Sequence, residues 1–190
     1  ILGRGFADGD ADIVWRNNST AQWKIWQMQD GTRVAQTIPA DFDLAHEWTV
    51  IGAGDTDKDG DDDVVLNNAT TGEVLIWEMQ NHAVTATHNV GTKTGYTLNR
   101  IGDFNKDGDV DLLVREIGTD VLVTWELENN LFVQERTLNT TGAGYNPVCA
   151  GDFDKDGDDD IMLINSSTMH EKWFVMENYV RTQAFGSSNT

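Results

Sequence analysis

The sequence predicts an all-β fold, a β-propeller-like array of four blades with four antiparallel strands each. Three observations predict it: an Asp-rich motif recurs four times, a strand-length apolar run follows each copy, and no long segment has the apolar period of a helix. Repeat units that each hold several short strands are typical of propeller blades.

The motif is clearest at residues 101–109 and 150–158, which read IGDFNKDGD and AGDFDKDGD. The same register fits residues 51–61, and an incomplete copy opens the chain at residues 2–12. These copies predict a single repeat domain, 1–190, with units at about 1–47, 48–97, 98–146 and 147–190.

In each unit we expect one short strand before the loop, such as 49–51 or 148–150, and three strands after it. The first of the three is the apolar run, at 13–15, 64–66, 112–114 and 161–164. The second strand carries a Trp that we place at the same phase of the strand, and so on the same face, in all units: Trp26, Trp77, Trp125 and Trp173. The third is rich in Thr and Gln, which predicts an outer, solvated strand, as at 84–90 or 133–138.

A Trp at one phase of every unit favours core packing over a sugar-stacking surface. Trp23 and Trp48 lie outside this phase, so they are the better candidates for exposed contacts. Since the histidines fall at unrelated positions of their units, we expect loop or surface roles for His46, His82, His88 and His170.

The loops carry oxygen-rich side chains at alternating positions. In the second loop Asp55, Asp57, Asp59 and Asp63 occupy positions 1, 3, 5 and 9, and Gly60 at position 6 lets the backbone reverse. A Ca²⁺ ion takes about six to eight oxygen ligands, and a curled loop turns alternate carboxylates inward, whereas Mg²⁺ favours retained waters. Because Leu66 stands where an EF-hand needs Glu, these are predicted calcium loops in a β context.

Three calcium sites are expected, in the loops that start at Asp55, Asp103 and Asp152. The first loop is degenerate, because Arg4 and Phe6 replace the ligands at positions 1 and 3. We predict no ion there and expect the Arg4 guanidinium to lie against Asp8 or Asp12.

The charge balance narrows the possible partners. The chain has 13 basic and 32 acidic residues, a formal net charge of −19, and 19 of the acids fall in the four Asp-rich stretches. Such a polyanion repels nucleic acid and anionic lipid, and no apolar run approaches the ~20 residues that span a bilayer. With Cys149 as the only cysteine and no leader segment, the chain is expected to be a mature or excised soluble piece without an internal disulfide.

Residues 102–112 and 151–161 resemble the FG-GAP/VCBS repeats, which build the blades of integrin-α heads, some fungal lectins and many secreted bacterial proteins. The bacterial form looks closest, with Trp strands after Asn-rich turns. The resemblance implies calcium binding through side chains, with position 7 giving its backbone carbonyl. The implied ligands are Asp55, Asp57, Asp59, Asp61, Asp63, Asp103, Asn105, Asp107, Asp109, Asp111, Asp152, Asp154, Asp156, Asp158 and Asp160.

The favoured function is a secreted, non-catalytic module that recognises a glycan or an extracellular protein, since no catalytic motif is present. One alternative is a structural subunit of an extracellular filament or surface layer. Another is a polysaccharide lyase-type domain, which the acidic composition disfavours.

Related propellers often carry seven blades, so four units are at the low limit for closing a ring. Three arrangements stay open: a compact four-bladed ring, part of a longer chain, or a subunit that completes its sheets with neighbouring copies. Because a ring of four whole units would close without an exchanged strand, we also predict a homo-oligomer or polymer, with contacts in the first and fourth units.

Five Asn-x-Ser/Thr triplets could accept glycan in a eukaryotic secretory route. Most of them fall in predicted hairpin turns, where Asn is favoured for its backbone tolerance. We therefore expect turn formation to be their main role, at Asn17, Asn18, Asn68, Asn139 and Asn165.

Overall fold

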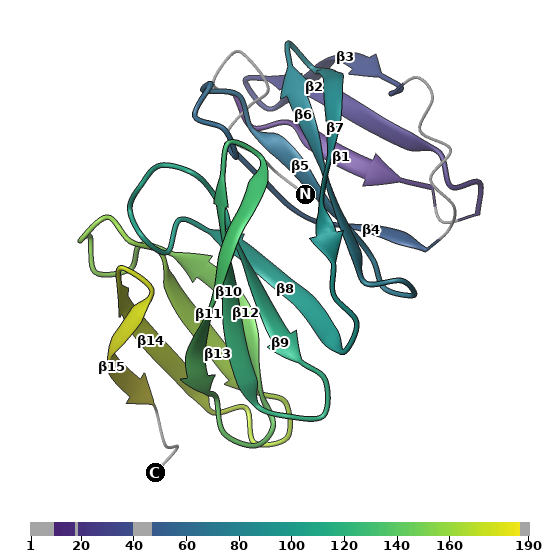
Figure 1. Ribbon diagram of the computed structural model, residues 1–190. Helices are drawn as coiled ribbons and strands as arrows, with labels where there is room; N and C mark the ends of the chain where they lie inside the picture. The colour runs from purple at the N-terminus through teal and green to yellow at the C-terminus, as the bar shows by residue number, and fades with distance from the viewer. Residues whose placement is uncertain (1–9, 18, 40–46, 187–190) are drawn as a thin grey trace. The chain divides into compact units, whose positions relative to one another are not determined.

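The structure is a computed structural model that describes residues 10–17, 19–39 and 47–186 (Figure 1). Every regular element among these residues is a β-strand, and all strand pairs are antiparallel. The predicted all-β, blade-like fold is therefore confirmed. No described segment forms a helix that is long and apolar enough to cross a membrane.

The strands form four sheets, or blades, in which each strand pairs with its neighbours in sequence. The strand expected before the first loop falls on residues 1–9, outside the described part of the chain. Blade 1 has β1 (Ile13–Arg16), β2 (Trp23–Gln29) and β3 (Thr32–Thr37). Blade 2 has β4 (Trp48–Gly54), β5 (Asp63–Asn68), β6 (Glu73–Gln80) and β7 (Ala83–Thr92); blade 3 has β8 (Tyr96–Gly102), β9 (Asp111–Glu116), β10 (Val121–Glu128) and β11 (Leu131–Thr140); and blade 4 has β12 (Tyr145–Gly151), β13 (Asp160–Asn165), β14 (Glu171–Glu177) and β15 (Val180–Gly186).

The blades fall into two compact units. Unit 1 holds blades 1 and 2 together with the turn Asn129–Leu131, and unit 2 holds the rest of blade 3 and blade 4. Each unit has its own apolar core, which its two blades share.

The two faces of a blade differ, because successive side chains of a strand point to opposite sides. We call "Trp face" the side that carries Trp26, Trp77, Trp125 or Phe174 and its cross-strand partner, and "reverse face" the other side. In unit 1 the reverse face of blade 1, with Val14 and Ile25, packs on the Trp face of blade 2, with Val64 and Trp77. Unit 2 repeats this arrangement: Leu113 and Leu122 on the reverse face of blade 3 pack on Ile161 and Phe174 on the Trp face of blade 4.

The expected common phase of the four tryptophans is wrong in blade 4. Ile13, Val64 and Leu112 each pair with a Trp, but their counterpart Ile161 pairs with Phe174, and Trp173 pairs with Met162 on the reverse face. The three consecutive apolar residues Trp173, Phe174 and Val175 left the phase of this strand open to two readings. Core packing is confirmed for Trp77 and Trp125, which are buried, whereas Trp26 and Trp173 are half-buried.

The expected exposure of Trp23 and Trp48 is also wrong. Both are buried in the core of unit 1, with 4% and 7% of their surface exposed. Trp23 lies on the reverse face of blade 1, where its ring meets Trp77 edge-on with 5.4 Å between centroids. The interface between two blades therefore buries aromatic residues outside the repeated Trp phase.

The hairpin turns use Asn as the sequence predicts. Asn17, Asn68 and Asn165 each accept hydrogen bonds at Oδ1 from the backbone N–H groups two and three residues further on, at 2.8 to 3.1 Å. These are Asx turns, in which a short side chain replaces a backbone carbonyl. The turn role is thus confirmed for these three asparagines.

Candidate metal centres

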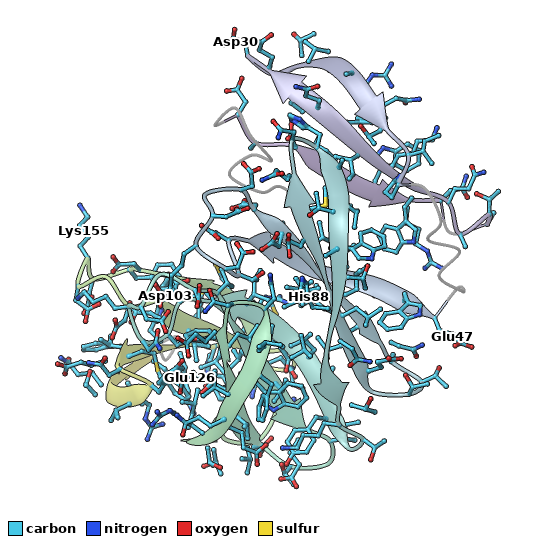
Figure 2. The ribbon with its side chains drawn as sticks, turned by 45° about the horizontal axis from the view of Figure 1, so that its top comes forward. Asp30, Glu47, His88, Asp103, Glu126 and Lys155 are labelled. Atoms are coloured by element: carbon cyan, nitrogen blue, oxygen red, sulfur yellow. The ribbon has the colours of Figure 1, made fainter. Side chains whose placement is uncertain are left out.

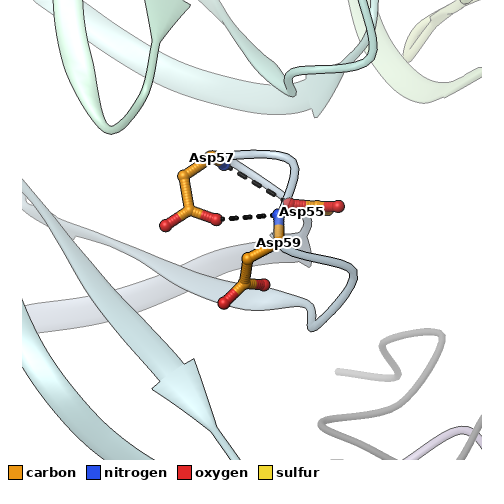
Figure 3. Close-up of side chains that lie close together, drawn as sticks. All are labelled: Asp55, Asp57 and Asp59. Atoms are coloured by element: carbon orange, nitrogen blue, oxygen red, sulfur yellow. Dashed lines mark hydrogen bonds between the residues drawn. The ribbon is translucent and has the colours of Figure 1, made fainter.

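The loop between β4 and β5 curls around the side chains of its own aspartates (Figure 3). Asp55 Oδ1 accepts a hydrogen bond from the N–H of Asp57 (3.4 Å), and Asp57 Oδ1 accepts one from the N–H of Asp59 (3.2 Å). The other oxygen of Asp55 accepts from the N–H of Gly60 at 3.1 Å. Each of these bonds orients one carboxylate oxygen, so the loop holds its alternate side chains in a fixed arrangement.

This arrangement brings three carboxylates together in two loops. Ligand oxygens of Asp55, Asp57 and Asp59 lie within 4.8 Å of one another, as do those of the corresponding set Asp152, Asp154 and Asp156. Positions 1, 3 and 5 therefore converge as the sequence predicts. Calcium binding by these residues stays a prediction.

The loop between β8 and β9 has the same form, with an amide in place of one carboxylate. Asp103 Oδ2 accepts from the N–H of Gly108 (3.0 Å), and Asn105 Oδ1 accepts from the N–H of Asp107 (3.1 Å). The Asn105 amide also donates to Asp107 Oδ2 at 2.9 Å. An amide oxygen is a neutral calcium ligand, so this loop offers the same donor positions with one charge less.

Position 6 needs glycine for its backbone conformation. Gly60, Gly108 and Gly157 have φ values of 97°, 94° and 102°, in the left-handed region that side chains other than glycine rarely adopt. The preceding position 4 is also left-handed in all three loops, where it is Lys58, Lys106 or Lys155. Lys155 is exposed at the tip of its loop and projects away from blade 4 (Figure 2).

The side chain at position 7 binds the hairpin turn of its own blade. Asp61 Oδ2 accepts from the N–H of Asn81 (3.3 Å), and Asp158 Oδ2 accepts from the N–H of Asn178 (2.6 Å). This use of the carboxylate suits the expectation that position 7 would offer a metal its backbone carbonyl. That expectation itself stays a prediction for Asp61, Asp109 and Asp158.

The aspartate at position 9 anchors the loop to the second strand after it. Asp63 Oδ1 accepts from the N–H of Met79 at 2.8 Å, sixteen residues further on. The same bond recurs for Asp12 with Met28, Asp111 with Leu127 and Asp160 with Met176, at 2.8 to 3.0 Å. Pairing with the outer strand shifts register just before Met28, Met79 and Met176, so these N–H groups are directed to the aspartate instead of the regular ladder.

Burial dominates the electrostatics of position 9. It raises the pKa of Asp63 from 3.8 to about 6 and that of Asp111 to about 7, although hydrogen bonds to both carboxylates oppose the rise. The pKa of Asp160 is also raised by burial. At position 3, burial and then the negative charge of Asp59 raise the pKa of Asp57. Carboxylates in such surroundings ionise more readily beside a cation.

The loops of blades 1, 2 and 3 are also contacted by the hairpin turn of the following blade. The second residue of that turn is left-handed, with φ of 64° for His82, Asn130 and Tyr179. The N–H of Asn130 donates to the carbonyl of Thr56 (3.0 Å), and the N–H of Tyr179 donates to that of Phe104 (2.9 Å), so both turns bind position 2 of a loop. Their side chains reach the ligand positions: the Asn130 amide donates to Asp57 Oδ2 (3.1 Å), and the Tyr179 hydroxyl lies against Asp111.

In the first loop the structure describes Asp10 and Asp12. Asp12 is fully buried, and its Oδ2 lies 3.1 Å from His82 Nε2, which belongs to the turn of blade 2. Arg4, Phe6 and Asp8 lie outside the described residues, so the expected contact of Arg4 with Asp8 or Asp12 stays a prediction. His82 was expected in a loop or at the surface, and its pairing with Asp12 was not foreseen.

The family comparison agrees with the geometry of these loops. The model of the FG-GAP-like repeat matches residues 55–114 and 103–163, which together make up more than half of the chain. The fold, the loops and this match to the family model define a protein built from β-propeller-type repeats. The chain belongs to the FG-GAP-like repeat family. No curated protein matches the sequence.

Sequence reasoning missed the contacts between a turn and the loop of the preceding blade. The only signal was that His82, Asn130 and Tyr179 occupy the same place in their units, directly after an Asn. Since the three residue types differ chemically, their common role was visible only once the turns and loops were placed in space.

Proposed function

We propose that this chain is a secreted, calcium-binding module of the β-propeller type that recognises a glycan or a protein outside the cell, and that it is not an enzyme. The observation that supports the proposal most directly is the convergence of oxygen ligands at positions 1, 3 and 5 of β-framed loops. Membership in the FG-GAP-like family supports it further, because such repeats commonly bind calcium and are typically extracellular and non-catalytic.

The residues present fit a calcium ion. Side chains at positions 1, 3, 5 and 9 and the carbonyl of position 7 would hold it in each of the three loops, and the bound ion would supply positive charge among crowded carboxylates. The backbone N–H groups of the loop keep the side chains oriented, and the position 9 aspartate connects the site to β6, β10 or β14. The role of calcium is therefore structural.

Calorimetric titration of the chelated protein tests the metal part of this proposal. We expect three calcium ions per chain, weaker binding of magnesium, and a higher melting temperature with calcium, because a ligand of the native state stabilises that state. Asp107→Ala should remove one ion, whereas Asp8→Ala in the degenerate loop should remove none. Equal melting curves with excess calcium and with chelator would sink the calcium assignment.

Solution mass and a glycan array test the recognition part. A monomer that binds particular glycans or an extracellular protein would support a recognition module. A second candidate, a structural subunit of an extracellular filament or layer, is favoured by the half-buried faces of blades 1 and 4. Concentration-dependent polymers without ligand binding would favour this second function instead.

A further inference from the structure

The two units share one packing rule. In each unit the reverse face of the earlier blade packs on the Trp face of the later blade. Of the four faces that take no part in these cores, the Trp face of blade 1 and the reverse face of blade 4 have half-buried apolar residues, whereas on the other two the apolar residues that pair between the central strands are buried. We call the Trp face of blade 1 the first end face and the reverse face of blade 4 the last end face, and among the described residues neither is covered by a second sheet of its own unit.

Both end faces are apolar but only half-buried. On the first end face Ile13, Trp15 and Trp26 are half-buried, although the corresponding residues of blade 2, Val64, Leu66 and Trp77, are fully buried. On the last end face Met162, Ile164, Trp173 and Val175 are half-buried. Exposed apolar area of this kind is typical of a surface that another protein covers.

The position 2 aromatic residues show the same contrast. Phe104 is fully buried in unit 2, where the turn at Tyr179 binds its carbonyl. Its counterpart Phe153 is 43% exposed, and its ring meets Trp173 edge-on with 4.8 Å between centroids. The loop of blade 4 thus presents an aromatic pair where the preceding loop carries the turn of the next blade.

The charges of the end faces are complementary. Lys24 and Arg33 lie over Trp15 and Trp26 of the first end face, with the charged groups 5.2 and 5.0 Å from the ring centroids. The last end face carries Glu171, paired with Ile164, at the register where blades 1 and 2 have the buried residues Trp23 and Val74. The first end face therefore carries cations and the last end face carries an anion, at positions where the interface inside unit 1 has apolar residues.

We propose that the first end face of one copy of the chain docks on the last end face of a second copy, by the packing rule used inside each unit. In unit 1, Trp23 of the reverse face meets Trp77 of the Trp face. In the contact between two copies, Glu171 takes the place of Trp23, and Trp26 takes the place of Trp77. Because Arg33 lies over Trp26, Glu171 then lies beside Arg33. The turn residue Gly31 corresponds to Asn130 and Tyr179, so its N–H donates to the carbonyl of Phe153 in the partner copy.

A charge exchange across this contact tests the proposal, with mass measured by analytical ultracentrifugation in saturating calcium. The wild-type protein should show a mass that rises with concentration. Arg33→Glu or Glu171→Arg alone should weaken self-association at least about tenfold, because like charges then meet. A mixture of the two variants should associate again, since each supplies the complement of the other.

The control is Glu135→Arg on β11, an exposed charge of blade 3, which carries neither end face, and it should leave association unchanged. Circular dichroism checks that each variant folds, and Lys24→Glu replaces Arg33→Glu if that variant does not fold. A wild-type protein that stays monomeric at every concentration would overturn the proposal. A mixture of the two variants that remains monomeric would also overturn it. Variants that lower only the melting temperature, without changing the mass, would overturn it too, because the end faces then meet within one chain. The test does not depend on calcium stoichiometry or on ligand binding.

Discussion

His82 Nε2 lies 3.1 Å from Asp12 Oδ2, so the turn of blade 2 places an imidazole against the buried carboxylate of the first loop. Asp12 is fully buried, and its other oxygen accepts a hydrogen bond from the N–H of Met28 at 2.8 Å. In the three later loops the same position is a predicted calcium ligand. Here a side chain of the neighbouring blade stands beside the carboxylate.

Replacing His82 by Ala should lower the free energy of unfolding by about 1 to 3 kcal/mol, because Asp12 loses a partner while it remains buried. Urea denaturation measures the change. His170→Ala is the control, since His170 is half-buried in blade 4 and should cost little. Equal losses for the two variants would show that the contact with Asp12 does not stabilise blades 1 and 2.

Removing the Tyr179 hydroxyl should weaken unit 2. The ring is buried in the core and its hydroxyl lies against Asp111, so Tyr179→Phe keeps the packing and should cost roughly 1 kcal/mol. The control is Tyr145→Phe, because the main polar contact of that ring is with Lys172, whose Nζ lies 3.9 Å from the ring centroid. A Tyr179→Phe variant as stable as the wild type in chemical denaturation would contradict this role of the hydroxyl.

Gly60 should resist substitution for a backbone reason alone. A Cβ at Gly60 would meet no atom within 4 Å, but its φ of +97° is strained for any other residue. Gly60→Ala should therefore cost about 1 kcal/mol or more, whereas Gly151→Ala, where a Cβ meets Phe153 at an ordinary 3.6 Å, should cost less. Thermal unfolding of the two variants in chelator separates this cost from metal binding.

The sequence predicted the strand order and the loops well, because both depend on local patterns. The alternation around Trp77 and the spacing of Asp55, Asp57 and Asp59 are visible without tertiary structure. The local pattern of blade 4 does not show which residues of β14 lie on the Trp face, because Trp173, Phe174 and Val175 are all apolar. Only the pairing of Phe174 with Ile161 settles it.

The contacts between blades could not be predicted in the same way. Trp23 and Trp48 looked like surface residues because they lie outside the repeated phase, yet the interface of two blades buries both. The double role of Asp63 was equally hidden, since its bond to Met79 depends on a register shift between β6 and β7. Features that depend on how one strand or blade meets another need the three-dimensional structure.

Two buried carboxylates should make the stability of the metal-free protein depend on pH. Burial raises the pKa of Asp63 from 3.8 to about 6 and that of Asp111 from 3.8 to about 7 in the folded protein without metal. A carboxyl group whose pKa is raised on folding favours the native state when it is protonated. Its contribution is therefore complete below its unfolded pKa and is lost as the pH rises through its folded pKa.

In chelator, these two groups should make the protein less stable as the pH rises from about 4 to about 7, with little further change above that range. Saturating calcium should reduce or reverse this trend, because a cation favours the ionised carboxylates. Melting temperatures at several pH values, with chelator and with calcium, measure both trends. Asp111→Asn is the matched variant: it removes the group with the higher pKa and should flatten the chelator curve above about pH 6. A chelator curve that rises steadily with pH, or that is the same in the variant, would show that these buried carboxylates do not govern the pH dependence of stability.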